Sequence, residues 1–236
     1  MTARVIVALD VLSAREALSL VSRLGAACDF VKVGSALFTA AGPEIVDRLR
    51  ARGCDVFLDL KFHDIPNTVR DASLAAARAG ARLLSVHASG GQAMIAAALD
   101  GVQSAATGDD CSVFAVTVLT SLDAGQLGTV WGRAVMDVPA EVVRLAGIAR
   151  DAGAHGVVCS GQEAAAVRDR YGDVLALLVP GVRLAGGAVH DQKRVVTPAQ
   201  AVAAGAHYVV VGRTVTQAQD PADALSQVRA ELCGVL

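Results

Sequence analysis

The sequence is poor in aromatic residues and has no excess of basic charge. Aromatic side chains make up 3% of the 236 residues, and 21 lysines and arginines are balanced by 23 aspartates and glutamates, for a formal net charge of −2. Proteins that bind nucleic acid usually present a basic face or a set of rings on which bases stack. Neither feature is available, so we expect no nucleic-acid partner.

Cysteine motifs and long apolar segments are also missing. The five cysteines are scattered, and no two of them are spaced as C-x-x-C. This distribution favours neither a disulfide framework nor a thiolate metal site, and it fits a reducing cytosol. No apolar run approaches the roughly 18 residues of a membrane-spanning helix, and the apolar start of the chain is too short for a signal peptide. We therefore expect a cytoplasmic protein without a membrane partner.

The sequence does have many apolar residues, arranged in short runs. Hydrophobic residues make up 53% of the chain and charged residues 19%, which is enough for a sizeable core. Near-continuous apolar runs occupy residues 4–10, 30–34, 55–61, 82–88, 112–119, 156–160, 175–181 and 208–213. Such runs are typical of parallel strands covered on both faces, and the segments between them are rich in the helix formers Ala, Leu, Arg and Glu.

Repetition of this unit indicates the fold. Ala-Gly-Ala followed by Arg or His recurs at 79–82, 152–155 and 204–207, each time between a predicted helix and the next strand. Eight strand–helix units close a (β/α)8 TIM barrel, and we predict one such domain over residues 1–236. An open doubly wound sheet is the alternative, but no G-x-G-x-x-G motif follows the first strand.

Several predicted helices have recognisable ends. Ser13 and Glu16 form a capping-box pattern for the first helix, and the second is expected to open at Gly42-Pro43 and to stop at Gly53. The longest interval between strands, 119–159, is expected to hold an extended loop and a helix over 139–153.

Charged residues stand at the predicted carboxyl ends of the strands, where barrel enzymes have their active sites. The ionisable residues at these ends are Asp10, Lys32, Asp59, Lys61, His87 and Arg213. Asp59 and Lys61 are two residues apart and therefore share a face of their strand, whereas Leu58 and Leu60 point toward the helices. Burying several ions is a poor way to gain stability, so the cluster favours an active site over an internal salt bridge.

A second group of polar residues follows the last two predicted strands. The loop 182–196 contains Arg183, Gly186-Gly187 and Gln192-Lys193-Arg194, and Gly212-Arg213 precedes the last helix. Barrels commonly bind phosphate at these loops through backbone N–H groups and an arginine. The pattern predicts a phosphorylated ligand; a basic loop without a ligand is the alternative.

The segment Asp59-Leu60-Lys61-Phe62-His63-Asp64-Ile65-Pro66-Asn67-Thr68 resembles the D-x-K-x-x-D-I-P-x-T motif of the orotidine 5'-phosphate decarboxylases. The resemblance continues in order along the chain at 8–10, 31–34, 118–121, 180–183, 191–194 and 211–213. It implies a homodimeric (β/α)8 enzyme that converts orotidine 5'-monophosphate to uridine 5'-monophosphate and CO2 without a cofactor or metal.

The resemblance also implies roles for individual residues. Lys32, Asp59, Lys61 and Asp64 match the charged array of the family, in which Lys61 protonates C6 and Asp64 reaches the site of the partner subunit. The residues implied to bind substrate are Asp10 and Lys32 at the ribose, Thr68 at the ribose or phosphate, Thr120 with or without Ser121 at the pyrimidine, and Arg183, Gln192, Gly212 and Arg213 at the phosphate. The roles of His87 and Trp131 stay open.

Two other functions compete with this one. Related barrels share D-x-K-x-x-D but act as magnesium-dependent sugar-phosphate decarboxylases or aldolases; they tend to carry a metal-binding Glu where Lys32 stands, and they lack Ile65-Pro66-x-Thr68. A cation at position 32 would repel a divalent metal. A non-catalytic nucleotide-binding barrel is the other alternative, but it would have no need of Lys61 between acidic residues.

Overall fold

The computed structural model describes residues 3–106, 111–134, 137–184 and 195–234. In these ranges eight parallel strands pair in chain order, and β8 pairs with β1 to close the barrel. The strands are β1 Arg4–Ala8, β2 Phe30–Gly34, β3 Asp55–Phe62, β4 Leu83–His87, β5 Ser112–Val116, β6 Gly156–Val158, β7 Ala176–Val179 and β8 Tyr208–Val211. The predicted (β/α)8 barrel is confirmed, and the open-sheet alternative is wrong.

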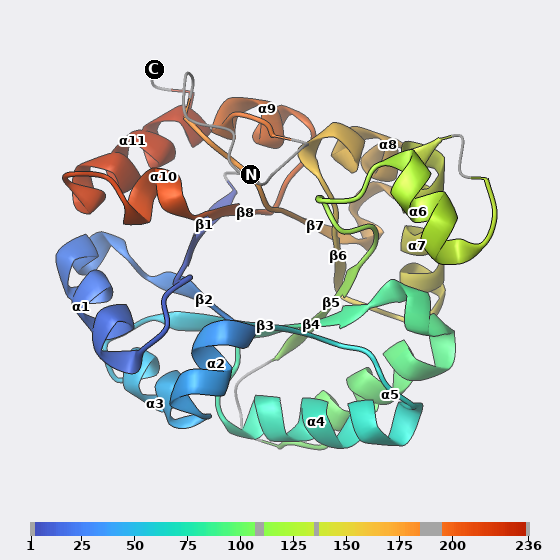
Figure 1. The fold of residues 1–236 in the computed structure, drawn as a ribbon, viewed down its shortest axis with the longest axis horizontal. Helices are drawn as coiled ribbons and strands as arrows, with labels where there is room; N and C mark the ends of the chain where they lie inside the picture. Colours follow the sequence, from blue (N-terminus) through green and yellow to red (C-terminus); the bar gives the residue numbers. More distant parts are fainter. Residues whose placement is uncertain (1–2, 107–110, 135–136, 185–194, 235–236) are drawn as a thin grey trace.

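Helices form an outer ring around the strands (Figure 1). They are α1 Ala14–Leu24, α2 Ser35–Ala41, α3 Glu44–Arg50, α4 Pro66–Arg78, α5 Gly91–Gln103, α6 Ala124–Trp131, α7 Val138–Asp151, α8 Gly161–Tyr171, α9 Pro198–Ala203, α10 Arg213–Thr216 and α11 Pro221–Leu232, with short 3-10 turns η1 Gly25–Ala27, η2 Ala88–Gly90 and η3 Gly172–Val174. Within the described ranges, no helix is long and apolar enough to cross a bilayer.

Helices α2 and α6 were not predicted from the sequence. Helix α2 follows β2 directly and ends at Gly42, so the helix predicted from Gly42-Pro43 is the second one after β2, α3. Helix α6 lies in the long interval before α7 and begins at a capping box formed by Asp123 and Gln126. The first helix begins as predicted, because the Ser13 side chain accepts a hydrogen bond from the Glu16 N–H at 3.2 Å.

The repeated Ala-Gly-Ala segments end helices and align strands. Gly153 and Gly205 have φ values of 85° and 90°, a conformation that glycine adopts at little cost. The histidines two residues later then reach the neighbouring strands: Nδ1 of His155 accepts from the Val113 N–H, and Nδ1 of His207 from the Leu177 N–H, both at 3.0 Å. The repeat thus has the same structural use in two units of the barrel.

Two apolar clusters make up the core. The larger lies between the strands and the helices, and the smaller fills the barrel with residues that include Ile6, Phe30, Phe57 and Phe114. Because side chains alternate along a strand, the next inward-facing residues after Phe30 and Phe57 are Lys32 and Asp59. A polar layer therefore lies directly above an apolar one, toward the carboxyl ends of the strands.

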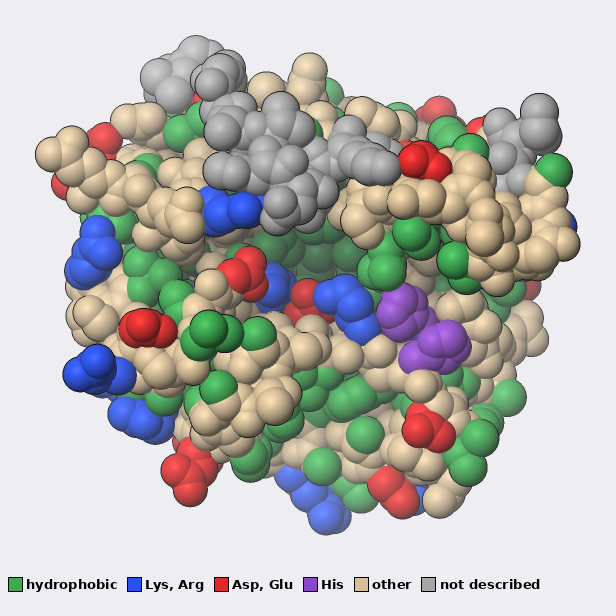
Figure 2. Space-filling view, viewed as in Figure 1, with side chains coloured by type: hydrophobic (Ala, Val, Ile, Leu, Met, Phe, Trp, Pro, Cys, Tyr) green, Lys and Arg blue, Asp and Glu red, His purple; other side chains and the backbone are tan. Residues whose placement is uncertain are grey.

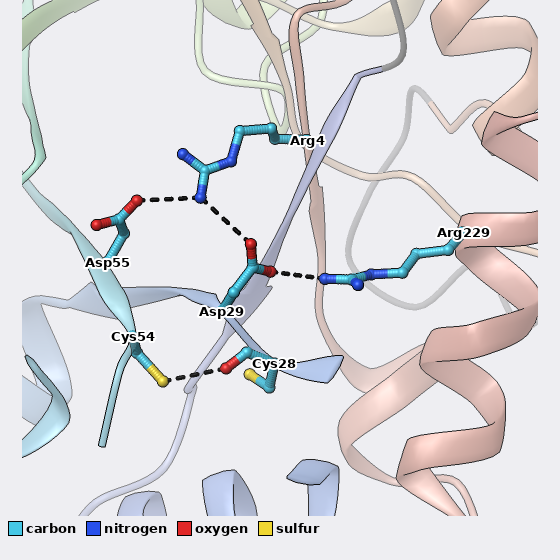
Figure 3. A network of polar contacts seen from close by, with 6 residues as sticks. All are labelled: Arg4, Cys28, Asp29, Cys54, Asp55 and Arg229. Atoms are coloured by element: carbon cyan, nitrogen blue, oxygen red, sulfur yellow. Dashed lines mark hydrogen bonds and ion pairs between the residues drawn. The ribbon is translucent and has the colours of Figure 1, made fainter. Parts of the chain in front are cut away.

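Ion pairs link neighbouring strands at the end of the barrel opposite the polar layer (Figure 3). Asp29, just before β2, pairs with Arg4 of β1 at 3.3 Å and with Arg229 of α11 at 2.6 Å, and Arg4 also pairs with Asp55 of β3 at 3.0 Å. These side chains are between 41% and 52% exposed, so each pair contributes at most about 1 kcal/mol to stability. This network holds β1, β2 and β3 together far from the polar layer.

Candidate active site

A cavity of about 360 Å³ opens at the carboxyl ends of the strands. Figure 2 shows it as a hollow with acidic, basic and histidine side chains gathered along one side. Apolar side chains such as Phe57, Val116 and Leu178 contribute to its lining. The predicted site residues that line it are Asp10, Lys32, Asp59, Lys61, Thr120, Ser121, Arg183, Gly212 and Arg213.

Four of these residues form a continuous chain of ion pairs. Lys32 Nζ lies 2.9 Å from Asp10 Oδ1 and 3.8 Å from Asp59 Oδ2, and Lys61 Nζ lies 2.8 Å from the same Asp59 oxygen. We call Asp10, Lys32, Asp59 and Lys61 the ion-pair chain. Lys32 lies in β2, Asp59 and Lys61 lie in β3, and Asp10 follows β1. The formal charge of the ion-pair chain is zero.

Asp59 is the buried centre of this chain, with only 9% of its surface exposed. Burial raises the pKa of its carboxyl, but the charges of Lys61 and Lys32 and the hydrogen bonds from Lys61 and Ser85 outweigh burial and hold the pKa below its usual value. Asp59 is therefore ionised at neutral pH, and it holds the Lys61 ammonium beside the cavity.

The backbone of β3 departs from regular geometry where it carries these two residues. Phe57 and Leu58 pair with Leu83 and Leu84 of β4, but the register shifts before Phe62 pairs with Val86. Lys61 has a φ of 52°, in the left-handed region that residues other than glycine rarely adopt. The sequence pattern of alternating faces gave the correct side for Asp59 and Lys61 but no sign of this bulge.

Ser85 of β4 bridges the two ends of the bulge. Its hydroxyl accepts a hydrogen bond from the Lys61 backbone N–H at 2.9 Å and donates one to Asp59 Oδ1 at 2.8 Å. Ser85 was not among the site residues predicted from the sequence. The available signal was a hydroxyl in the apolar run of β4, two residues before His87 and therefore on the same inward face.

The loops after β7 and β8 form another part of the cavity lining. Arg183 is buried, and its backbone N–H donates to the Val196 carbonyl at 3.0 Å, which closes the base of the loop 182–196. Gly212 and Arg213 line the cavity between β8 and α10. Gln192, Lys193 and Arg194, predicted as part of this loop, lie outside the described residues.

Asp64 and Thr68 are not among the cavity-lining residues. Both are exposed, and the Asp64 carboxylate accepts a hydrogen bond from the Ile65 N–H at 2.6 Å. Among the described residues, no ion pair joins Asp64 to Lys32 or Lys61. A single chain therefore assembles three members of the predicted charged array, Lys32, Asp59 and Lys61, and leaves Asp64 outside it.

Two histidines lie beside the ion-pair chain. The rings of His63 and His87 have centroids 5.2 Å apart. Burial, then the charges of His63 and Lys61, lower the pKa of His87 below its usual value, which leaves its ring neutral at pH 7. Trp131, whose role the sequence left open, packs against the core with the Arg133 guanidinium 5.3 Å from its ring centroid.

The described acidic and histidine side chains of the site do not gather into a metal-binding cluster. Among the residues that the structure describes, no group of three or more His, Cys, Asp or Glu side chains could hold a metal ion. Within the ion-pair chain, the Lys32 ammonium stands between Asp10 and Asp59.

Comparison with known proteins identifies the family of this chain. Residues 3–228 match the family described as orotidine 5'-phosphate decarboxylase / HUMPS. The chain belongs to this family. A relative from Halorhodospira halophila, named orotidine 5'-phosphate decarboxylase, is 50% identical over 230 residues, covering 97% of this chain and 95% of the relative. A relative of the same name from Nitrosococcus oceani is 46% identical over 233 residues, covering 98% of each chain.

Structural comparison agrees with the family membership. The crystal structure of orotidine 5'-phosphate decarboxylase from Lactobacillus acidophilus superposes with a TM-score of 0.87 at 36% identity, over 98% of this chain and 99% of that one. The family resemblance predicted from residues 59–68 is confirmed over nearly the whole chain.

Proposed function

We propose that this family member converts orotidine 5'-monophosphate to uridine 5'-monophosphate and CO2, with residues 1–236 acting as one catalytic domain. The observation that carries the proposal is the Lys61 ammonium, held 2.8 Å from buried Asp59 at the wall of a cavity of about 360 Å³. The names of the curated relatives support the same reaction.

The chemistry needs a cation at this place. When the bond between C6 and the carboxylate breaks, its electron pair stays on C6, where the ring offers no nearby electron sink. The Lys61 ammonium stabilises this charge and then donates a proton to C6, which leaves a neutral amine that solvent reprotonates. Because the ammonium is already held in place, little reorganisation is needed during the reaction.

Asp59 has two effects in the same step. Its negative charge near the substrate carboxylate raises the energy of the bound substrate, and this repulsion is relieved as CO2 leaves. It also attracts the ammonium groups of Lys61 and Lys32, which lie 2.8 Å and 3.8 Å from its carboxylate, and so holds both beside the substrate.

The other lining residues bind the rest of the nucleotide. Asp10 and Lys32 hold the ribose hydroxyls, and Thr120, with or without Ser121, contacts the pyrimidine edge. Arg183, Gly212 and Arg213 bind the phosphate together with Gln192 of the loop 182–196. Phosphate binding far from C6 then contributes free energy to loop closure and to stabilisation of the transition state.

The reaction is tested by following the absorbance of orotidine 5'-monophosphate with and without a chelator. We expect turnover that survives exhaustive chelation, because no step requires a metal or cofactor. Loss of turnover that magnesium restores would favour the related sugar-phosphate enzymes. Binding of uridine 5'-monophosphate without any turnover would indicate a non-catalytic barrel.

The active enzyme is a cytoplasmic homodimer in which Asp64 completes the site of the partner subunit. Asp64 lies outside the ion-pair chain of its own subunit, and a second cavity of about 290 Å³ reaches that chain between Leu12 and Gly34. Leu12 is 74% exposed, and Ile65, next to Asp64, is 67% exposed. A second copy that covers these apolar side chains could insert its Asp64 loop through this opening. The cytoplasmic location is supported by the free thiols at all five cysteines.

Hybrid dimers test this arrangement. Lys61→Ala and Asp64→Asn homodimers should both be nearly inactive, but in a hybrid the Asp64→Asn subunit keeps Lys61 and receives an intact Asp64. Random remixing of equal amounts makes half the dimers hybrids with one good site each, so about a quarter of wild-type activity should return. Hybrids verified by differential tagging that stay inactive would show that Asp64 acts within its own subunit.

A further inference from the structure

Ser85 is fully buried in β4 and lies at the level of Asp59 inside the barrel. Both hydrogen bonds of its hydroxyl go to β3: one comes from the Lys61 backbone N–H, and one goes to the Asp59 carboxylate. The Ser85 side chain therefore contacts both Lys61, which carries the reactive ammonium, and Asp59, which pairs with it.

The bulge in β3 needs such a partner. A residue other than glycine in the left-handed region, such as Lys61 at a φ of 52°, is strained and persists only where its surroundings hold it. The register shift between Leu58 and Phe62 removes this stretch from the regular ladder with β4, so the Lys61 N–H needs an acceptor other than a strand carbonyl. The Ser85 oxygen is that acceptor.

The other hydrogen bond fixes the Asp59 carboxylate. Ser85 binds Oδ1, while Oδ2 faces the ammonium groups of Lys61 and Lys32 at 2.8 Å and 3.8 Å. Because Ser85 holds one oxygen, rotation of the Asp59 carboxylate about its Cβ–Cγ bond would break the contact to Ser85. The direction in which Asp59 presents the Lys61 ammonium is therefore set from β4.

We infer that Ser85 is a positioning residue for the proposed decarboxylation: its hydroxyl holds the β3 bulge and the Asp59 carboxylate so that the Lys61 ammonium faces the substrate. This inference rests on the proposed function, because the position of Lys61 matters to turnover only if Lys61 donates the proton. In the proposed function the phosphate binds at the loops after β7 and β8, so substrate affinity should depend little on Ser85.

Substitution of Ser85 separates positioning from binding. In Ser85→Ala we expect kcat to fall about 10- to 100-fold, since two buried polar groups lose a partner, while KM stays within about threefold of wild type. Ser85→Thr keeps the hydroxyl and should restore most of kcat. Ser85→Cys is close to serine in size but forms weak hydrogen bonds, so it should resemble Ser85→Ala.

The pH profile gives a readout that a purely structural role would not move. The charged and titratable groups around Asp59 are Lys32 from β2, Lys61 from β3 and His87 from β4, with Asp10 beyond Lys32. Loss of the Ser85 hydrogen bond removes one of the causes that lower the pKa of Asp59. The acid limb of the kcat profile should therefore move to higher pH in Ser85→Ala.

Ser73→Ala is the matched control. Ser73 of α4 is also fully buried, and its Oγ has no hydrogen-bond partner among the described residues, so its removal should leave kcat unchanged. Wild-type kcat in folded Ser85→Ala, or equal losses in Ser85→Thr and Ser85→Ala at unchanged thermal stability, would overturn the inference. If Ser85→Ala does not fold, full activity in Ser85→Cys would overturn it. An inactive wild type would instead remove the proposed function, and this inference with it.

Discussion

Replacing Asp59 with asparagine is the sharpest test of the ion-pair chain. The side chain keeps its shape, but the oxygen that faces Lys61 at 2.8 Å and Lys32 at 3.8 Å loses its charge. If the amide nitrogen takes that position, it points two more donors at the ammonium groups. If the amide turns over, its nitrogen faces Ser85, and the hydrogen bond from the Ser85 hydroxyl is lost. Neither orientation reproduces the wild-type contacts.

The size of the effect follows from burial. Removing one partner of a buried ion pair costs about 3–5 kcal/mol. Asp59 is 9% exposed, but 35% of the Lys61 side chain is exposed and 13% of Lys32, so solvent compensates part of the loss and the lower end of that range applies. The transition state depends on the same Lys61 ammonium, so we expect it to lose a similar amount of stabilisation. A loss of about 3 kcal/mol corresponds to a fall of roughly 100-fold in kcat.

The opposite end of the barrel offers a matched control for this charge removal. Asp29 also pairs with two cations, Arg4 and Arg229, but it is 52% exposed and lies in the network of Figure 3. Asp29→Asn should change kcat less than about twofold and stability by less than about 1 kcal/mol. Both variants are measured by steady-state decarboxylation and urea unfolding. An Asp59→Asn enzyme that keeps kcat within tenfold of wild type would refute the role given to the ion-pair chain.

The other predictions concern the two ends of the site and the pH. Lys61→Ala should abolish turnover but keep its affinity for uridine 5'-monophosphate, as measured by calorimetry. Arg213→Ala should lower kcat/KM about 10- to 100-fold, because a charged contact to the phosphate is lost. Equal effects of the two variants on kcat would contradict this division between chemistry and binding. The pKa of Asp59 is lowered by folding, so its contribution to stability is fully present above its unfolded pKa of about 3.9 and is lost as the pH falls through the folded value. Urea unfolding should therefore show the stability of wild type relative to Asp59→Asn declining below about pH 4, and a constant difference from pH 6 to pH 3 would contradict the lowered pKa.

Much of the barrel could be predicted because its strands are covered on both faces. Continuous apolar runs marked the eight strands, and the glycines at 80, 153 and 205 marked helix ends where φ is positive. Helix α2 was missed because it follows β2 without a separating turn, and its boundary with α3 is the Gly42-Pro43 pair that was assigned to the start of a helix. Predicted strand ends such as Asp10 and Arg213 lie beyond the last paired residues, because side chains at a barrel mouth belong to the loops as much as to the strands.

In the site, the charged side chains could be predicted from the sequence, but the backbone geometry that holds them could not. Charged residues inside apolar runs stand out in any sequence, and Lys32, Asp59 and Lys61 were found for that reason. The left-handed backbone at Lys61 cannot be recognised in the sequence, because lysine has no special preference for that conformation. The conformation also depends on a contact from another strand, β4. Ser85 was overlooked because a serine in an apolar strand is chemically unremarkable until its two partners are known. The side chain proposed to donate the proton could thus be predicted from its own strand. The residue proposed to position it belongs to the neighbouring strand, and its role depends on the register shift between β3 and β4.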